Sequence, residues 1–98
     1  MGLTFEWHET KADTNRRKHG VSFEEAKTVF ADPLSLVIPD VAHSEQEERW
    51  VRIGISVRTR LLVVVCTERG EAIRLISSRR ATIDERADYE KANKDASH

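Results

Sequence analysis

One run of apolar residues constrains the fold of this chain more than any other feature. Residues 61–67 read LLVVVCT, which would place apolar side chains on both faces of a strand. A strand that is buried on both faces lies in the middle of a sheet. Turn sequences bound the run, RTR at 58–60 and ERGE at 68–71, and Gly70 can take the positive φ that such turns need. The sequence therefore predicts a central strand between two short turns.

The segments on either side predict the neighbours of this strand. Residues 50–57 alternate, so that Val51 and Ile53 would lie on one face of a sheet while Trp50 and Arg52 lie on the other. Residues 72–78 read as a third strand. Because the connections are short, the three strands should form an antiparallel meander. We expect helices on one face of this sheet, with the other face open to solvent or to a ligand.

The rest of the chain predicts an α+β fold with a C-terminal helix. Two capping boxes, in which a hydroxyl and a glutamate each accept a hydrogen bond from the other residue's backbone N–H, should begin helices. The expected elements are an edge strand at 5–7, a polar helix at 9–19 ended by Gly20, a helix from Ser22–Glu25 to Asp32-Pro33, a strand at 34–38, an exposed acidic loop at 41–48, and a helix from Thr82–Glu85 to about Lys94.

Composition limits the class of protein. A chain of 98 residues should form a single domain, residues 1–98, because a second core would need roughly 50 residues of its own. The single cysteine, Cys66, excludes an intrachain disulfide, and no apolar segment approaches a membrane span. We expect a soluble cytoplasmic protein without membrane association.

Charge is distributed unevenly along the chain. The net charge is −1, yet eight arginines and only two glutamates, Glu68 and Glu71, lie between Arg49 and Arg80. Attraction of a phosphate depends on the local field more than on the total charge. The central strands are therefore a candidate phosphate-binding surface, although solvated strand residues would give the same pattern.

Arginines beside an aromatic residue suggest binding of RNA. Alternation predicts that Trp50, Arg52 and Arg74 share the sheet face opposite the helices, and Arg79 and Arg80 follow at the end of the last strand. The guanidinium fork pairs with phosphate through two hydrogen bonds, and its flat face stacks on bases. The alternative is that the last two arginines only form ion pairs with Glu68, Glu71 or Glu85.

Lys18 and His19 are the second candidate site. Cations in the last turn of a helix are favoured by the helix dipole, so a structural role accounts for both. A histidine can also exchange a proton with a ribose hydroxyl near neutral pH, which would make it a general acid or base. His8, His43 and Cys66 lack the spacing of metal ligands, so no metal site is expected.

Four segments in the same order resemble the BrnT toxins of bacterial type II toxin–antitoxin systems. They are FEWHETKADTNRRKHGVSFEEAKTVFADPL, HSEQEERWVRIGIS, RLLVVVCTERG and IRLISSRRATIDERADYE. The resemblance implies a RelE-like fold, an antiparallel sheet flanked by helices. It also implies a ribonuclease that blocks translation until a BrnA-type antitoxin binds it. The partner would carry a ribbon-helix-helix part, join the toxin in a heterotetramer and repress the operon, so the toxin would meet DNA only through the antitoxin.

The resemblance also carries site residues. The positions that match recurrent motifs are Lys18, His19, Gly20, Arg79, Glu85 and Arg86, with Arg80 a weaker match. Combined with residue chemistry, they suggest metal-independent cleavage without a cofactor, in which the ribose 2′-hydroxyl attacks the adjacent phosphate. Arg79 would stabilise the charge on the phosphate, and Lys18 or His19 would move protons, with Glu68 as a possible base. The expected RNA contacts are Arg52, Arg80, Arg74, Trp50 and Arg86.

A second interpretation of the resemblance involves no catalysis. Many relatives look to have a histidine where this chain has Cys66. A catalytically inactive homologue that binds the antitoxin and acts only as a co-repressor is therefore the alternative.

Overall fold

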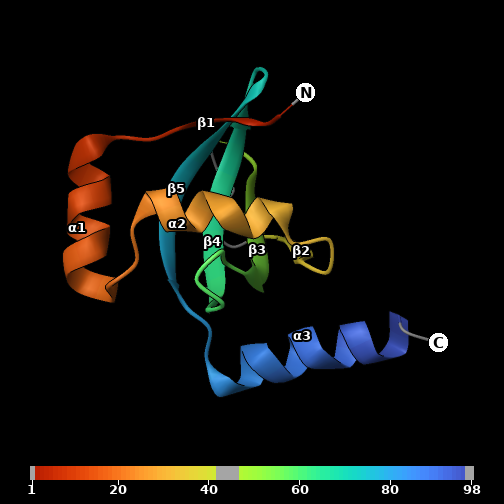
Figure 1. Ribbon diagram of the computed structural model, residues 1–98. Coiled ribbons are helices and arrows are strands. Elements are labelled where there is room, and N and C mark those ends of the chain that lie inside the picture. The colour runs from red at the N-terminus through yellow and green to blue at the C-terminus, as the bar shows by residue number, and fades with distance from the viewer. Residues whose placement is uncertain (1, 42–46, 97–98) are drawn as a thin grey trace.

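A five-stranded sheet forms the centre of the computed structural model, which describes residues 2–41 and 47–96 (Figure 1). The elements are β1 (Thr4–Glu6), α1 (Glu9–His19), α2 (Phe23–Ala26), the 3₁₀ helix η1 (Lys27–Ala31), β2 (Leu36–Pro39), β3 (Arg49–Ile55), β4 (Leu61–Arg69), β5 (Ala72–Arg80) and α3 (Ile83–Ala96). The strand order is β1-β5-β4-β3-β2. The predicted acidic loop at 41–48 falls largely outside the described residues.

The antiparallel meander is confirmed, and β4 is its central strand. β3 and β5 both pair antiparallel with β4, and Leu62 and Val64 in β4 are fully buried. β2 extends the sheet antiparallel at one edge. β1 lies at the other edge, as predicted, but it pairs parallel with β5, with Phe5 opposite Ile73. The sheet is therefore mixed. A parallel pair requires a crossover connection, and the helices and strands between β1 and β5 in the chain provide it.

Pro39 ends β2 at the outer edge of the sheet. The backbone N–H of Asp40 donates to the carbonyl of Arg49 at 2.9 Å, and Pro39 is opposite Trp50. Since inward and outward backbone groups alternate along an antiparallel strand, the nitrogen of Pro39 lies on the outer side, where it carries no hydrogen.

Alternation along β4 divides the core between the two faces of the sheet. Leu62, Val64 and Cys66 pack with α2 and η1 on one face, here called the α2 face. Leu61 and Val63 pack with Ile53 and with Tyr89 of α3 on the other, the α3 face. In Figure 1, α2 and η1 cross in front of the strands and α3 lies at their lower end. The face that was expected to be open, that of Trp50 and Arg52, is therefore the one that α2 and η1 cover, and α3 packs at one end of the other.

A single buried side chain fastens α1 to the sheet. α1 has the predicted bounds and ends at Gly20, whose φ is 70°, and Asn15 is its buried residue. The Asn15 amide accepts from the Ser78 backbone N–H at 3.0 Å and donates to the Ser78 carbonyl at 2.8 Å and to the Val21 carbonyl at 2.9 Å. β1 pairs with β5 only over residues 72–74, so Asn15 supplies the partner that the strand lacks farther along.

The first capping box forms only in half. The Ser22 hydroxyl accepts from the backbone N–H of Glu25 at 3.1 Å, as predicted. The Glu25 carboxylate does not reach back, however, because it accepts from Nε of Arg60 at 2.9 Å and from the Ser56 hydroxyl at 2.7 Å. The hydrogen bond from Arg60 is the largest cause of the lowered pKa of Glu25. This carboxylate therefore joins α2 to the turn between β3 and β4.

Asp32 ties the end of η1 to β3 and to α3. Its Oδ2 atom accepts from the backbone N–H of Ile55 at 2.8 Å and from the Tyr89 hydroxyl at 2.7 Å, and its Oδ1 accepts from the backbone N–H of Leu34 at 2.9 Å. Burial first, and then the hydrogen bond to Asp32, raise the pKa of Tyr89 to about 12. The tyrosine hydroxyl thus remains a donor at neutral pH and holds α3 in place.

Replacement of Asn15 by alanine should destabilise the fold. The change leaves the Ser78 N–H and carbonyl and the Val21 carbonyl buried without their partner, which should lower the free energy of unfolding by roughly 2 to 4 kcal/mol. Urea denaturation at pH 7 measures this. Thr14→Ala is the matched control, because Thr14 is exposed and bonds only to the Thr10 carbonyl of its own helix; it should change stability by less than about 0.5 kcal/mol. Equal stability of the two variants would contradict the role of Asn15.

Candidate functional site

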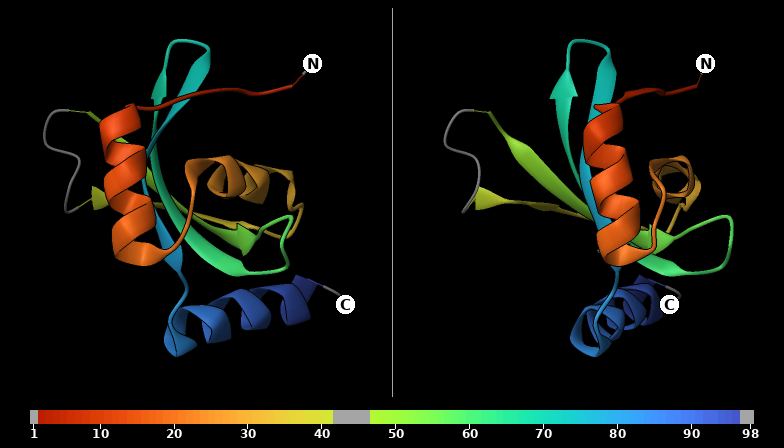
Figure 2. Two further views of the ribbon diagram at one scale, coloured as in Figure 1. Left: turned by 60° about the vertical axis from the view of Figure 1, so that its left-hand side comes forward. Right: turned by 90° about the vertical axis from the view of Figure 1, so that its left-hand side faces the viewer.

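Three elements meet at one corner of the molecule: the last turn of α1, the end of β5 and the start of α3. The contact between Asn15 and Ser78 places the last turn of α1 beside the end of β5. α3 begins at Ile83, directly after β5 ends at Arg80. Figures 1 and 2 show this convergence at the lower end of α1. The corner brings together several of the residues that the sequence predicted for a site.

Arg79 is held at this corner by three hydrogen bonds. It lies opposite Val63, on the α3 face. Its Nη1 and Nη2 atoms donate to Oε1 and Oε2 of Glu85 at 2.7 and 2.8 Å, and Nη1 also donates to the Arg80 carbonyl at 3.3 Å. The sequence offered Glu68, Glu71 and Glu85 as ion-pair partners, and Arg79 pairs with Glu85. The hydrogen bonds from Arg79 are the largest cause that lowers the pKa of Glu85 to about 2.

The second capping box is complete and fixes the same carboxylate. The backbone N–H of Glu85 donates to the Thr82 hydroxyl at 3.2 Å, and Oε1 of Glu85 accepts from the backbone N–H of Thr82 at 2.8 Å. Both halves of the prediction are confirmed. One carboxylate thus begins α3 and holds Arg79, so the strand end, the turn and the helix start form one rigid unit.

Lys18 and His19 line a groove between α1 and β5 of about 290 Å³, together with Ile76 and Ser77. Ser77 lies opposite Val65 and so shares the α3 face with Arg79, two residues along the strand. The last turn of α1 also carries Arg16 and Arg17. The structure therefore brings Lys18 and His19 to the edge of the surface that carries Arg79.

Arg80 and Arg86 complete the basic corner from two directions. Arg80 lies opposite Leu62 and is exposed on the α2 face, so the two adjacent arginines lie on opposite faces of the sheet. Arg86 is exposed in the first turn of α3, next to Glu85.

The prediction that Trp50, Arg52 and Arg74 share an open face is wrong. Trp50 packs against the core of the α2 face, and the Arg52 guanidinium stacks on the Phe30 ring at 4.6 Å and donates to the Ser35 hydroxyl at 2.8 Å. Arg74 lies on the α3 face, where it donates to Glu6 at 2.7 and 2.9 Å. Its partner in β4 is Thr67, which is opposite Arg49 rather than Trp50.

Gly54 explains why η1 covers this face. Gly54 shares a face with Trp50 and Arg52, and a Cβ atom there would lie 2.8 Å from the Val29 side chain and 2.9 Å from that of Ser35. Only a glycine lets η1 approach β3 this closely. Alternation separates the two faces of a strand but does not say which is covered.

Glu68 lies with Trp50 and Arg52, away from the corner. The three residues line a recess of about 60 Å³ on the α2 face with Phe30, Val37, Cys66 and Ile73. Burial raises the pKa of the Cys66 thiol to about 11, so this thiol is neutral at physiological pH. Trp50, Arg52 and Glu68 therefore lie on the face of the sheet opposite to that of Arg79.

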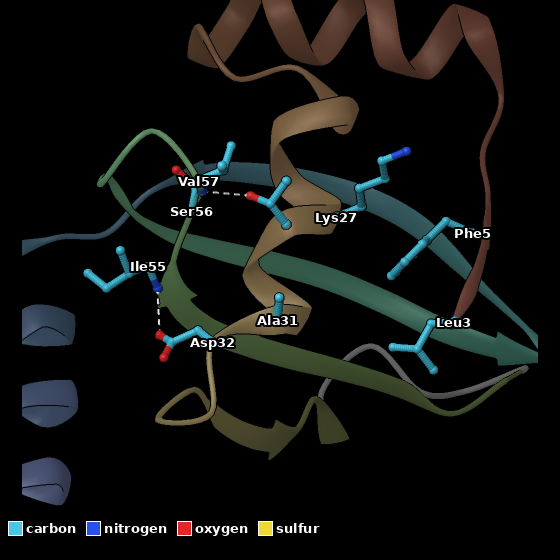
Figure 3. Close-up of a pocket in the computed structure, with 9 residues that line it drawn as sticks. Leu3, Phe5, Lys27, Ala31, Asp32, Ile55, Ser56 and Val57 are labelled. Atoms are coloured by element: carbon cyan, nitrogen blue, oxygen red, sulfur yellow. Dashed lines mark hydrogen bonds between the residues drawn. The ribbon is translucent and has the colours of Figure 1, made fainter. Parts of the chain in front are cut away.

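A groove of about 690 Å³ is mostly apolar and is lined by none of these candidate residues. Figure 3 shows Leu3 and Phe5 on one side of it and Ile55 and Asp32 on the other, with Ala31 of η1 between them. The Asp32 carboxylate is already engaged by Ile55 and Tyr89. The groove therefore offers apolar contact and little reactive chemistry.

Two kinds of feature are missing from residues 2–41 and 47–96. No group of three or more histidine, cysteine, aspartate or glutamate side chains is placed to hold a metal ion. Nor does any helix there combine the length and the apolar character needed to cross a bilayer.

Sequence reasoning missed the contacts that assemble the corner. Asn15 is one polar residue among many in a helix whose other residues are mostly exposed, and nothing in the sequence distinguishes it. The bond between Glu25 and Arg60 joins residues 35 positions apart. Only the pair between Arg79 and Glu85 had a local signal, because the capping box marks Glu85 as a residue at the start of a helix.

Comparison with known proteins bears on the family and the fold of the chain. Residues 7–85 match the model of a family described as the ribonuclease toxin BrnT of type II toxin–antitoxin systems. The chain is also similar to the crystal structure of the Brucella abortus ribonuclease toxin BrnT, with a TM-score of 0.65 and 26% sequence identity, covering 83% of this chain and 99% of that one. No curated protein matches the sequence.

The pair between Arg79 and Glu85 should make stability depend on pH in the acid range. The pKa of Glu85 is lowered from 4.5 to about 2, so the carboxylate stabilises the fold above pH 4.5 and loses this contribution as the pH falls toward 2. Because the pair is partly exposed, we expect Glu85→Gln to lower the free energy of unfolding at pH 7 by on the order of 2 kcal/mol. Urea denaturation from pH 7 to pH 2 should show this difference shrinking.

Glu47→Gln is the matched control. It also removes a carboxylate beside an arginine, here 3.8 Å from Arg69 Nε at the other end of β4. An exposed pair of this kind should contribute less than about 0.5 kcal/mol at pH 7. A difference between Glu85→Gln and the parent chain that stays constant from pH 7 to pH 2 would show that the ion pair is not its cause.

Proposed function

We propose that this chain, which belongs to the BrnT family of ribonuclease toxins of type II toxin–antitoxin systems, cleaves RNA at the corner where α1, β5 and α3 meet. The observation that carries the proposal is the position of Arg79. Its guanidinium is held by Glu85, its side chain remains 41% exposed, and it shares a sheet face with Ser77, which lines the groove of Lys18 and His19. A held, accessible cation at the same corner as a lysine and a histidine is suited to phosphodiester chemistry.

The proposed reaction uses the RNA's own 2′-hydroxyl as the nucleophile. That oxygen loses its proton and attacks the neighbouring phosphorus, a cyclic phosphate forms, and the 5′-oxygen of the next nucleotide leaves with a proton. Arg79 stabilises the charge that develops on the phosphate oxygens. Lys18 or His19 moves the protons, since both lie at the edge of the same surface. No metal ion takes part in this scheme.

The remaining cations divide by position. Arg80 and Arg86, both exposed at the corner, are proposed to hold the phosphates on either side of the cleaved bond. Arg74, on the same face as Arg79, is proposed to contact the RNA farther from the cleaved bond. Trp50, Arg52 and Glu68 line a recess that contains no residue of the corner, so the proposal gives them no direct contact with the cleaved phosphate.

The family also implies an antitoxin partner. We propose a BrnA-type protein with a ribbon-helix-helix part, joined with the toxin in a heterotetramer that represses the operon. An antitoxin that covers the basic corner would both neutralise its charge and exclude RNA.

Removal of the Arg79 side chain should abolish most cleavage. The purified chain should digest naked RNA in a buffer that contains EDTA, and Arg79→Ala should lower the rate by about 100-fold, because one contact to the developing charge is lost. Gel analysis of a labelled oligonucleotide measures the rate, and circular dichroism checks the fold. Arg69→Ala, at the far end of β4, is the control and should leave the rate unchanged. Full activity of folded Arg79→Ala would refute the site, and loss of activity in EDTA would refute the metal-free scheme.

A growth assay distinguishes the ribonuclease from a non-enzymatic co-repressor. The co-repressor has one observation in its favour, since Trp50, Arg52 and Glu68 do not join Arg79 in a single site. Induction of the chain without its antitoxin should arrest growth, and co-expression of a BrnA-type antitoxin should relieve the arrest. Normal growth of cells that contain the folded chain, with intact binding of the antitoxin, would favour the co-repressor.

A further inference from the structure

We propose that Glu85 is a positioning residue for the phosphate contact of Arg79. By occupying one edge of the guanidinium, it aims the other edge at the phosphate. This inference rests on the proposed function, because it assigns to Glu85 a role that is exercised only through Arg79.

The hydrogen bonds of Arg79 define which edge is free. A guanidinium has five N–H donors. Both protons of Nη1 are used, one on Oε1 of Glu85 and one on the Arg80 carbonyl, and one proton of Nη2 is used on Oε2 of Glu85. In the part of the chain that the structure describes, no acceptor takes the Nε–H or the second Nη2 proton. These two donors point from the same edge of the plane and form a fork that matches two phosphate oxygens.

The carboxylate is itself held firmly enough to act as a support. Oε1 of Glu85 accepts from the Thr82 backbone N–H, and the Glu85 backbone lies in the first turn of α3. Only 24% of the Glu85 side chain is exposed, against 41% for Arg79. The arginine is thus the more accessible partner, and the contact with Glu85 limits the directions in which its free edge can point.

A competing role for Glu85 predicts the opposite effect. If the carboxylate blocked Arg79, RNA would have to displace it, and loss of Glu85 would speed cleavage. The structure favours positioning, because a complete fork of donors remains free while the pair is intact. The two roles therefore differ in the sign of the effect on the rate.

The test is the kinetics of Glu85→Gln on a single-stranded RNA oligonucleotide at pH 7. Glutamine keeps one oxygen to accept from the Thr82 N–H, so the helix start is preserved, but it cannot accept from both arms of Arg79. We expect kcat to fall by about 10- to 100-fold while KM changes by less than about twofold, because alignment of the transition state is lost more than binding. Glu47→Gln makes the same change of charge beside Arg69 and should leave both constants unchanged.

A double variant shows whether Glu85 acts through Arg79. In an Arg79→Ala background, Glu85→Gln should cause no further loss of activity, whereas a purely structural role would lower the rate again by its own factor. Activity of Glu85→Gln that equals or exceeds that of the parent would overturn the inference. So would an additive loss in the double variant.

The same measurements separate this inference from the function on which it rests. If Arg79→Ala is inactive and Glu85→Gln is fully active, the proposed site stands and the positioning role fails. If Arg79→Ala keeps its activity, the proposed site fails as well. A folded parent chain that does not cleave RNA would overturn both.

Discussion

The amide of Asn15 is the contact on which the corner depends. α1 is a polar helix in which Ala12 packs partly buried against the core and Asn15 is the buried residue. The Asn15 side chain behaves like the backbone of a missing strand, accepting from and donating to Ser78. Because this contact fixes the position of α1 along β5, it also sets where Lys18 and His19 lie relative to the end of the sheet. The hydrogen bonds of one buried side chain thereby influence the geometry of the candidate site.

Three pairs of glutamate and arginine show how a chain of net charge −1 can present a basic corner. Arg60 is 20% exposed in its pair with Glu25, Arg74 is 27% exposed in its pair with Glu6, and Arg79 is 41% exposed in its pair with Glu85. The first pair is structural, because Glu25 is buried and bridges two segments. The last pair leaves its arginine the most exposed of the three, and the basic last turn of α1, Arg16 to His19, lies at the same corner. Position, more than number of charges, makes this corner distinct.

The sequence was informative wherever a signal was local. The two-sided apolar run of β4, the glycine that ends α1 and the capping box at Thr82 each depend on residues a few positions apart, and each was predicted correctly. The failures involve contacts between distant parts of the chain. Period-two alternation shows that Trp50 and Arg74 each lie on one face of a strand, but the register between strands decides whether they share it. Asn15 and Glu25 could not be assigned for the same reason, since their partners lie far away in sequence.

Both edge strands of the sheet are short, three residues in β1 and four in β2, and this has a consequence for how the molecule meets other chains. Pro39 offers no N–H on the outer side of β2, and α1 covers β5 beyond the short strand β1. An exposed strand edge is a common route to aggregation by backbone pairing, and short edge strands with a proline limit that route. A partner strand would find few backbone groups to pair with here, so the charge and shape of the side chains carry more of the recognition.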